Sequence, residues 1–234
     1  KMIKEGVDFI DVGAETSRPG SKPISDQEEL GKLTPVISLL VKNFDVPISV
    51  DTYKPVVAEA TLQAGAKIIN DITGLQRSSD MADTIARFQA GVVLMHMQGT
   101  PLTMQKNPEY KNVLDEICDF LAVSIKIAEA AEISPDQIAI DPGIGFGKTN
   151  KHNLEILKKL EKFLELKKPL LLGVSRKSFI GDILNLLPEE RLDGSLAATV
   201  MGVVKGASII RTHDVKSTRN AVRVAEAIIK GESL

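Results

Sequence analysis

Polar residues follow several short apolar runs of this 234-residue chain. Asp51, Asn70 and Asp141 each stand directly after a run rich in β-branched residues, which places each one at the end of a predicted buried strand. A buried carboxylate or amide is unfavourable unless another group donates hydrogen bonds to it. Together the three residues predict a ligand rich in ring N–H and amino groups, whereas any one alone could equally cap a helix or fix a loop.

Cationic residues follow the last two apolar runs. Lys177 stands just beyond the sixth run, and Arg211 and His213 come after the seventh and open the last helical segment. The free N–H groups and the dipole of a helix N-terminus favour an anion, and arginine binds phosphate through two parallel hydrogen bonds. We therefore expect Arg211 and His213 to bind an anion, whereas Arg176 is expected to form only a surface ion pair.

The segment 141–149 reads DPGIGFGKT and invites a nucleotide-binding interpretation. Its spacing fails two tests, because a phosphate loop needs glycine where Pro142 stands and a dinucleotide fingerprint needs glycine where Lys148 stands. The glycines instead predict a flexible turn over a pocket, with Phe146 as a lid or stacking group. A bare loop remains the alternative.

The segment 11–21 runs from an apolar strand into a loop whose hydroxyl groups surround Arg18. This composition predicts a loop that closes over a substrate, although a plain surface loop has the same composition. Ser25, at its end, is expected to cap the helix that follows.

Composition excludes several classes of function. With 29 basic and 31 acidic residues the net charge is -2, so no overall field attracts nucleic acid or an anionic membrane. The single Cys118 cannot form an intrachain disulfide, and no apolar run approaches the roughly 20 residues that span a bilayer. These features predict a cytoplasmic protein. The three histidines and Cys118 do not fall at zinc-site spacings, so we expect no metal cage built from protein alone.

Seven apolar runs alternate with stretches of helical period, which predicts parallel strands joined by crossover helices. The predicted strands are residues 9–12, 48–50, 67–70, 92–95, 138–140, 170–174 and 208–210. Two covering helices are predicted from the apolar positions Leu114, Ile117, Leu121, Ile125 and Ala128 and from Leu154, Leu157, Leu160 and Leu164. A last helix is predicted from its cap residues Asp214 and Gly231 and its apolar positions Val222, Ala225 and Ile229.

Such an order fits an open doubly wound sheet or a (β/α)8 TIM barrel. The convergence of polar strand ends on one mouth favours the barrel, an α/β fold.

The motifs, taken together, resemble the dihydropteroate synthase family of pterin-binding TIM barrels. The resemblance is carried in order by segments 11–20 (DVGAETSRPG), 49–52 (SVDT), 69–71 (IND), 95–97 (MHM), 141–146 (DPGIGF), 175–181 (SRKSFIG) and 211–215 (RTHDV). It implies a transferase of folate biosynthesis that condenses 6-hydroxymethyl-7,8-dihydropterin pyrophosphate with 4-aminobenzoate to give 7,8-dihydropteroate and pyrophosphate. It further implies Mg2+ as cofactor, a homodimer formed through the last two helices, and inhibition by sulfonamides.

The resemblance also implies roles for individual residues. Pterin contacts are implied for Asp51, Asn70, Ile72, Met95, Asp141, Gly173, Lys177 and Arg211. The implied catalytic residues are Asp51, Asp141, Lys177 and Arg211. The pyrophosphate would be bound by Arg18, Arg211 and His213. The aminobenzoate would be bordered by Thr16, Ser17, Arg18, Pro19, Phe146, Lys177 and Ser178.

The family's first strand has no counterpart in this sequence, and an Asn in that part of the family binds the metal. We therefore expect one N-terminally incomplete barrel domain over residues 1–234, without an identifiable metal ligand. Two alternatives stay open. One is the methyltetrahydrofolate-binding barrel of a corrinoid-dependent methyltransferase, which shares the Asp and Asn contacts but has no pyrophosphate to bind. The other is an inactive pterin-binding fragment.

Overall fold

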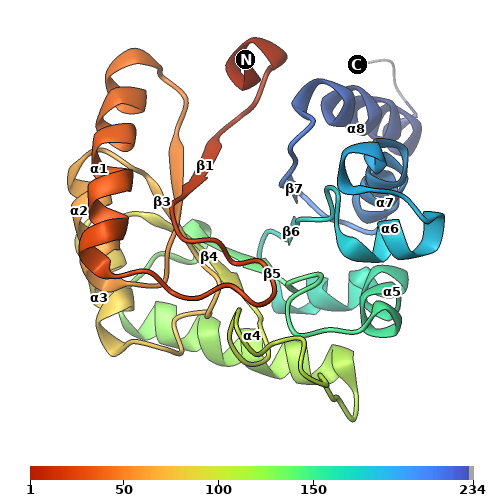
Figure 1. Cartoon of the computed structure of the whole chain (residues 1–234), viewed down its shortest axis with the longest axis horizontal. Coiled ribbons are helices and arrows are strands. Elements are labelled where there is room, and N and C mark those ends of the chain that lie inside the picture. Colours follow the sequence, from red (N-terminus) through yellow and green to blue (C-terminus); the bar gives the residue numbers. More distant parts are fainter. Residues whose placement is uncertain (232–234) are drawn as a thin grey trace.

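The computed structural model describes residues 1–231 as an α/β fold with parallel strands at its centre (Figure 1). Five strands pair in chain order: β1 (Ile10–Gly13), β2 (Ile48–Asp51), β3 (Ile68–Asp71), β4 (Gly91–Met95) and β5 (Ile138–Asp141). Two more, β6 (Leu171–Leu172) and β7 (Ile209–Ile210), pair with each other. A single parallel bridge between Ile140 and Leu170 links β5 to the second pair. The seven predicted strands are confirmed, each to within two residues at either end.

Helices alternate with the strands and cover their outer side (Figure 1). The α-helices are α1 (Asp26–Asn43), α2 (Pro55–Gln63), α3 (Ser79–Arg87), α4 (Val113–Ala130), α5 (Asn150–Lys158), α6 (Ser178–Leu184), α7 (Leu192–Val204) and α8 (Val215–Lys230). Short 3-10 helices are η1 (Met2–Glu5), η2 (Pro135–Gln137), η3 (Leu160–Leu166) and η4 (Pro188–Glu190). The last three residues of the predicted domain, 232–234, lie outside the described residues. In the described part of the chain no helix is both long and apolar enough to cross a membrane.

Local sequence signals explain where two helices begin and end. The Ser25 side chain accepts a hydrogen bond from the Glu28 backbone N–H at 3.2 Å, so the predicted cap of α1 is confirmed. Helix α8 ends at Gly231, whose φ of 68° is the left-handed conformation that glycine adopts at low cost.

Alternate residues of the strands face opposite sides, and both sides are buried. The outer side faces the helices, where strand residues such as Ile69 and Leu94 belong to the main hydrophobic core. A separate inner cluster is formed by Val93, Ala139 and Leu171, with Ile68 and Ile209 packed against them. The members of this inner cluster come from five successive strands, β3 to β7.

One predicted helical stripe is wrong in part. Leu154 and Leu164 are 45% and 41% exposed, whereas Ile156, Leu160 and Phe163 are fully buried. The α-helix ends at Lys158 and the chain continues as the 3-10 helix η3, whose three residues per turn change which positions face the core. Only Leu160 of the predicted stripe is buried as expected.

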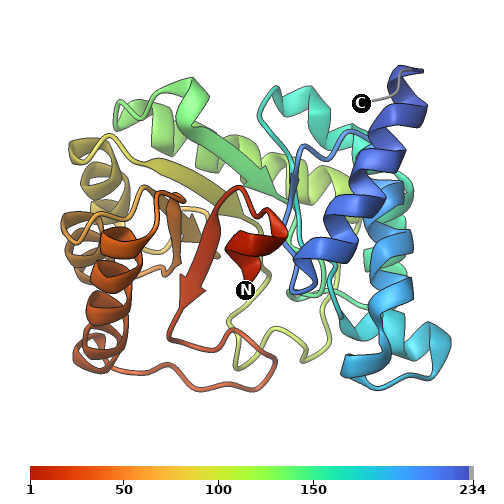
Figure 2. The same ribbon diagram turned by 90° about the horizontal axis from the view of Figure 1, so that it is seen from above.

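The predicted apolar face of α8 is also corrected. Ala225 is buried as expected, but Ile229 is 55% exposed, and the other buried positions are Val215 and Thr218. Helix α8 packs mainly against α7 and also contacts η1, which lies beside its first turns in Figure 2. Ile228 and Ile229, near the C-terminal end of α8, therefore remain mostly exposed within the described part of the chain.

Strands β1 and β7 do not pair with each other in the described residues. A cavity of about 740 Å³ opens between them, lined on one side by η1 and β1 and on the other by β7 and α8. The cavity also reaches the ends of β3 to β6, where the predicted site residues stand.

Candidate active site

Side chains alternate between the two sides of each strand, and those on the inner side form the site. On each of β3 to β7, the residue two positions after the inner-cluster residue lines the cavity. These five residues are Asn70, Met95, Asp141, Gly173 and Arg211. The register of the sheet adds Asp51, which is the partner of Asn70. Ile72, Phe146, Lys177 and His213 line the same cavity. The structure therefore brings together all the residues predicted to contact a pterin.

Arg211 connects the two strand edges that flank the cavity. Its Nε donates to Asp11 Oδ2 at 2.7 Å, and a terminal nitrogen donates to Asp51 Oδ2 at 3.2 Å. The amide of Asn70 donates to the same Asp11 oxygen at 3.2 Å. Asp11 was not among the predicted site residues, although a carboxylate inside an apolar strand was the signal that could have found it.

Burial sets the charges of the site. Burial and the neighbouring Asp11 carboxylate raise the pKa of Asp51 to about 7, against the opposing effect of Arg211. Burial also raises the pKa of Asp141, although the Gly143 N–H donates to its carboxylate at 2.7 Å. Burial lowers the pKa of Lys177 to about 8. Asp51 and Lys177 can therefore change charge near neutral pH.

Two buried oxygens, Asp11 Oδ1 and Asn70 Oδ1, have no hydrogen-bond partner in the described structure. Buried acceptors are nearly always satisfied by protein, water or ligand, so unsatisfied ones call for an external donor. Their place at the floor of the cavity agrees with the predicted ligand rich in N–H groups.

Phe146 forms a wall of the cavity. Its ring lies 4.2 Å from the Lys177 Nζ, a cation–π contact, and only 7% of the residue is exposed. It belongs to an apolar cluster that also contains Tyr53, Ile72, Met95, Met97 and Met104. The turn over the pocket is confirmed, but Phe146 is packed in place in this structure.

The loop after β1 is tied down at its base. Glu15 accepts hydrogen bonds from the Tyr53 hydroxyl at 2.6 Å and from Lys54 Nζ at 2.8 Å. Lys54 also donates to the fully buried Glu29 at 2.6 Å. Sequence reasoning missed this network, because nothing in the local pattern distinguishes Glu15 and Lys54 from solvated residues.

Five residues predicted at the aminobenzoate lie outside the residues that line the cavity: Thr16, Ser17, Arg18, Pro19 and Ser178. The tip of the loop is folded on itself, because Ser21 Oγ donates to the carbonyls of Thr16 and Arg18, each at 2.6 Å. The Gly20 N–H donates to the Pro101 carbonyl at 2.9 Å. The loop therefore rests against the segment that follows β4.

His213 is oriented by Ser175, whose hydroxyl lies 2.9 Å from His213 Nδ1. Arg176 forms the expected ion pair, with two hydrogen bonds to Asp214 at 2.6 and 3.0 Å. This pair uses the Asp214 carboxylate, so the predicted side-chain cap of α8 does not form. Burial, together with Arg176 and Arg211, lowers the pKa of His213, which favours the neutral ring.

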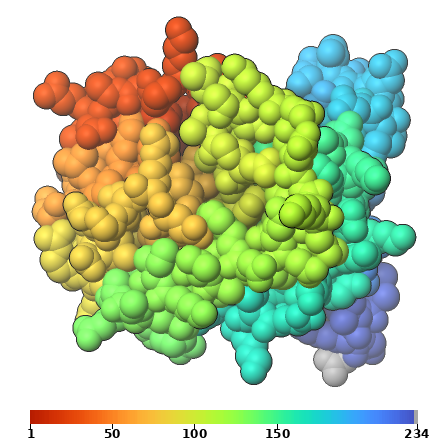
Figure 3. Space-filling view, turned by 90° about the horizontal axis from the view of Figure 1, so that it is seen from below, coloured from red at the N-terminus to blue at the C-terminus, as the bar shows by residue number. Residues whose placement is uncertain are grey.

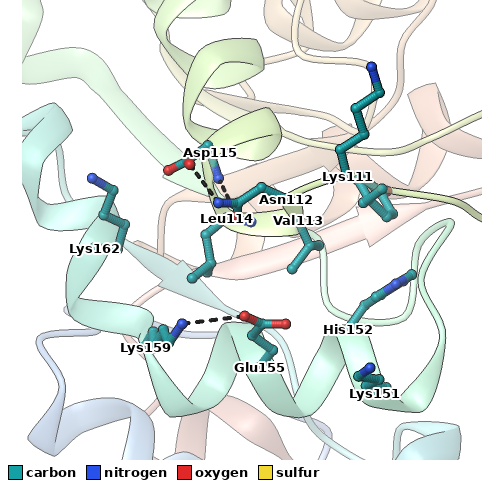
Figure 4. Close-up of a pocket in the computed structure, with 11 residues that line it drawn as sticks. Lys111, Asn112, Val113, Leu114, Asp115, Lys151, His152, Glu155, Lys159 and Lys162 are labelled. Carbon is teal, nitrogen blue, oxygen red and sulfur yellow. Dashed lines mark hydrogen bonds and ion pairs between the residues drawn. The ribbon is translucent and has the colours of Figure 1, made fainter.

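A second hollow of about 490 Å³ lies between the N-terminus of α4 and the helix α5 (Figure 4). It is lined by exposed lysines, and one of them, Lys159, is paired with Glu155 at 3.4 Å. None of the predicted site residues lines it.

A parallel α/β fold that presents buried carboxylates, an amide and two cations to one cavity defines a pterin-binding enzyme, and the family model described as "Pterin binding enzyme" matches residues 1–213. The dihydropteroate synthase of Escherichia coli (strain K12) is 45% identical over 231 residues, covering 99% of this chain and 82% of that protein. The dihydropteroate synthase of Clostridium beijerinckii is 43% identical, covering 98% and 83%. The chain belongs to the dihydropteroate synthase family of transferases.

Solved structures of dihydropteroate synthases are also similar to this chain. A Yersinia pestis dihydropteroate synthase in complex with a sulfonamide drug has a TM-score of 0.95 and 41% identity, covering 98% of this chain and 83% of that one. A Xanthomonas albilineans dihydropteroate synthase with 4-aminobenzoic acid has a TM-score of 0.91 and 40% identity, covering 97% and 81%. These likenesses support the synthase prediction over the methyltransferase alternative.

Proposed function

We propose that the chain condenses 6-hydroxymethyl-7,8-dihydropterin pyrophosphate with 4-aminobenzoate to give 7,8-dihydropteroate and pyrophosphate. The observation that carries the proposal is the single cavity in which the buried acceptors Asn70 and Asp141 lie beside the cations Lys177 and Arg211. Acceptors suit the N–H and amino groups of a pterin, and cations suit a pyrophosphate.

In the proposed complex Asp51, Asn70 and Asp141 accept hydrogen bonds from the pterin ring, and Lys177 donates to it. Ile72 and Met95 supply apolar walls and belong to the same buried cluster. Gly173 lines the cavity without a side chain, and a Cβ there would make an ordinary contact with the Arg211 Cβ at 3.8 Å.

The proposed reaction breaks the carbon–oxygen bond between the pterin methylene and the pyrophosphate, which leaves with the electron pair. The aminobenzoate nitrogen attacks the methylene carbon and loses a proton to water. Asp51 and Asp141 favour the positive charge that develops on the pterin, and Arg211, His213 and Arg18 bind the departing anion. Arg211 already lies between Asp11 and Asp51, so it can exchange one carboxylate for the pyrophosphate.

We propose that the aminobenzoate binds beside Phe146, Lys177 and Ser178, with the loop residues Thr16, Ser17, Arg18 and Pro19 closing over it. Closure requires the loop tip to move toward the cavity while Glu15 stays tied to Lys54. Sulfonamides would compete for this position, in line with the sulfonamide complex of the Yersinia pestis relative.

Mg2+ is proposed as a cofactor that arrives with the substrate. Among residues 1–231 no three His, Cys, Asp or Glu side chains gather into a possible metal site, so the described residues do not fit a protein-only metal centre. A hard cation such as Mg2+ prefers phosphate oxygens and water. Bound in this way, Mg2+ would offset the negative charge of the departing pyrophosphate.

We propose that the strands belong to a barrel of the (β/α)8 type, within a single pterin-binding domain over residues 1–234. The support is geometric. The inner cluster takes residues from β3 to β7, as the closed interior of a barrel does, and the two unpaired strand edges flank one cavity.

A cytoplasmic homodimer through α7 and α8 is also proposed. These two helices pack on each other and carry exposed apolar side chains, among them Met201 (53%), Val204 (56%), Val224 (61%) and Ile228 (76%). An exposed apolar patch of this kind commonly marks a protein interface.

Pyrophosphate release tests the proposed reaction. With the pterin pyrophosphate, 4-aminobenzoate and Mg2+, we expect pyrophosphate to form in step with dihydropteroate. Arg211→Ala should lose at least about 100-fold in turnover, whereas the exposed Arg87→Ala on α3 should not. Calorimetric binding of the pterin without any turnover would contradict the proposed catalysis and favour a binding-only barrel.

A further inference from the structure

Lys148 is a buried cation that the proposed reaction does not use. Only 2% of the residue is exposed, and no carboxylate pairs with it within the described range. Its Nζ donates to the Phe146 carbonyl at 2.9 Å and to the His96 carbonyl at 3.4 Å, and lies 2.9 Å from His96 Nδ1. Burial lowers the pKa of Lys148 to about 7, against the opposing effect of the Asp141 carboxylate, so a charge on this amine is unfavourable and a role other than packing must favour the residue over an apolar one.

The His96 ring must accept the third hydrogen bond. Burial, reinforced by the Lys148 charge, lowers the pKa of His96 to about 2, so the ring is neutral. When Lys148 is protonated its ammonium group has donors only, so the ring then accepts at Nδ1 and carries its proton at Nε2. The ring is held in place by an edge-on contact with Phe120 at 4.8 Å between centroids. Lys148 thus joins the end of β4 to the turn that carries Phe146.

The turn is held by three consecutive carbonyls that each accept a side-chain donor. Gln105 donates to the Gly145 carbonyl at 2.7 Å, Lys148 to that of Phe146, and the Tyr110 hydroxyl to that of Gly147 at 2.8 Å. Fixing the peptide planes on both sides of Phe146 fixes the direction of its side chain.

Two of these donors come from the segment 97–112 between β4 and α4. In Figure 3 this yellow-green segment lies on the surface between the red loop after β1 and the teal part of the chain. Its ends are tied together, because Gln98 and Glu109 exchange two hydrogen bonds, at 2.9 and 3.2 Å. The turn at Phe146 is therefore braced against an ordered neighbour.

We propose that Lys148 is a positioning residue for the aminobenzoate subsite, which, with Gln105 and Tyr110, holds Phe146 in the orientation that receives the aromatic substrate. The inference rests on the proposed function and adds to it. Of the three pterin acceptors, Asp51 and Asn70 stand on β2 and β3, and only Asp141 precedes this turn, so loss of the brace affects the second substrate more than the first.

The test compares Lys148→Met, Tyr110→Phe and Gln105→Ala with the exposed control Lys151→Met. The KM for 4-aminobenzoate is measured by pyrophosphate release, and the affinity for the pterin pyrophosphate by calorimetry. Lys148→Met should raise the KM for aminobenzoate by at least tenfold more than it weakens pterin binding. Tyr110→Phe and Gln105→Ala do not change a buried charged residue. They should raise the KM for aminobenzoate severalfold and leave the unfolding temperature unchanged.

Hydrogen exchange supplies a readout that needs no catalysis. In the three variants the backbone amides of residues 143–148 should exchange faster than in the wild type, and in Lys151→Met they should not. Equal losses for both substrates, or unchanged aminobenzoate KM in Tyr110→Phe and Gln105→Ala, would overturn the proposal. A wild-type chain that binds no aminobenzoate would refute the proposed function, while the exchange pattern would still decide whether Lys148 holds the turn.

Discussion

The Asp11→Asn substitution tests how the site sets the charge of Asp51. In the structure the two carboxylates share the guanidinium of Arg211, at 2.7 Å for Asp11 and 3.2 Å for Asp51. After burial, the negative charge of Asp11 is the largest influence that raises the pKa of Asp51 to about 7. The asparagine removes that charge and leaves Arg211 to pair with Asp51 alone, so both effects lower the pKa of Asp51.

The size of the expected shift in the Asp51 pKa follows from the repulsion between the two carboxylates. Two carboxylates bound to the same guanidinium repel each other by about 2 kcal/mol at an effective dielectric constant near 20. This repulsion exceeds the roughly 1.4 kcal/mol that corresponds to one pKa unit. The pKa of Asp51 should therefore fall from about 7 to about 6 or below. At pH 6 the wild-type carboxylate is ionised in about one molecule in eleven, and the variant's in about half. Relative to each protein's own maximum, kcat/KM at pH 6 should thus be about fivefold higher in the variant.

The assay is the pH dependence of kcat/KM for the pterin pyrophosphate, which reports groups of the free enzyme. Ionisation of the substrate is common to both proteins, so it cancels in the comparison. The alkaline limb, assigned to Lys177 with its pKa of about 8, should stay in place. Asp83→Asn, an exposed carboxylate on α3, controls for net charge. An acid limb that stays at the wild-type pH in Asp11→Asn, or moves upward, would refute the reasoning.

Three further predictions concern stability, assembly and the metal. Ile117→Ala should lower the free energy of unfolding by about 2 to 5 kcal/mol, because Ile117 is fully buried on α4. Val123 is 47% exposed on the same helix, so Val123→Ala should lower it by less than about 0.5 kcal/mol. Urea titration measures both values. Ile228→Asp should convert a dimer to a monomer in analytical ultracentrifugation, while Ile183→Asp on α6 should leave it a dimer; a monomeric wild type would contradict the proposed interface. Chelation with EDTA should abolish pyrophosphate release and leave the unfolding temperature of the ligand-free chain unchanged, since the described residues form no metal site; a lower unfolding temperature would reveal one.

Much of the fold was predictable because the parallel strands are buried on both faces. Continuous apolar runs therefore marked all seven strands, and the residue at the end of each run marked the cavity. The helices were less predictable. The predicted stripe failed at Leu154, where α5 buries Asn153 and Ile156 instead. It failed again at Leu164, which follows the change from α5 to the 3-10 helix η3, and that change depends on what the segment packs against.

The sequence by itself determined the positions of the strands along the chain and the chemistry of the cavity. Asp51, Asn70, Asp141, Lys177 and Arg211 stand at or after strand ends, and parallel strands point those ends the same way. Only the tertiary structure decided which groups interact. It placed Arg211 between Asp11 and Asp51, 200 and 160 residues away in sequence. It also buried Lys148 against His96 and tied Glu15 to Lys54. No local pattern encodes such pairs, because charge and burial at these positions depend on segments that meet only when the sheet has formed.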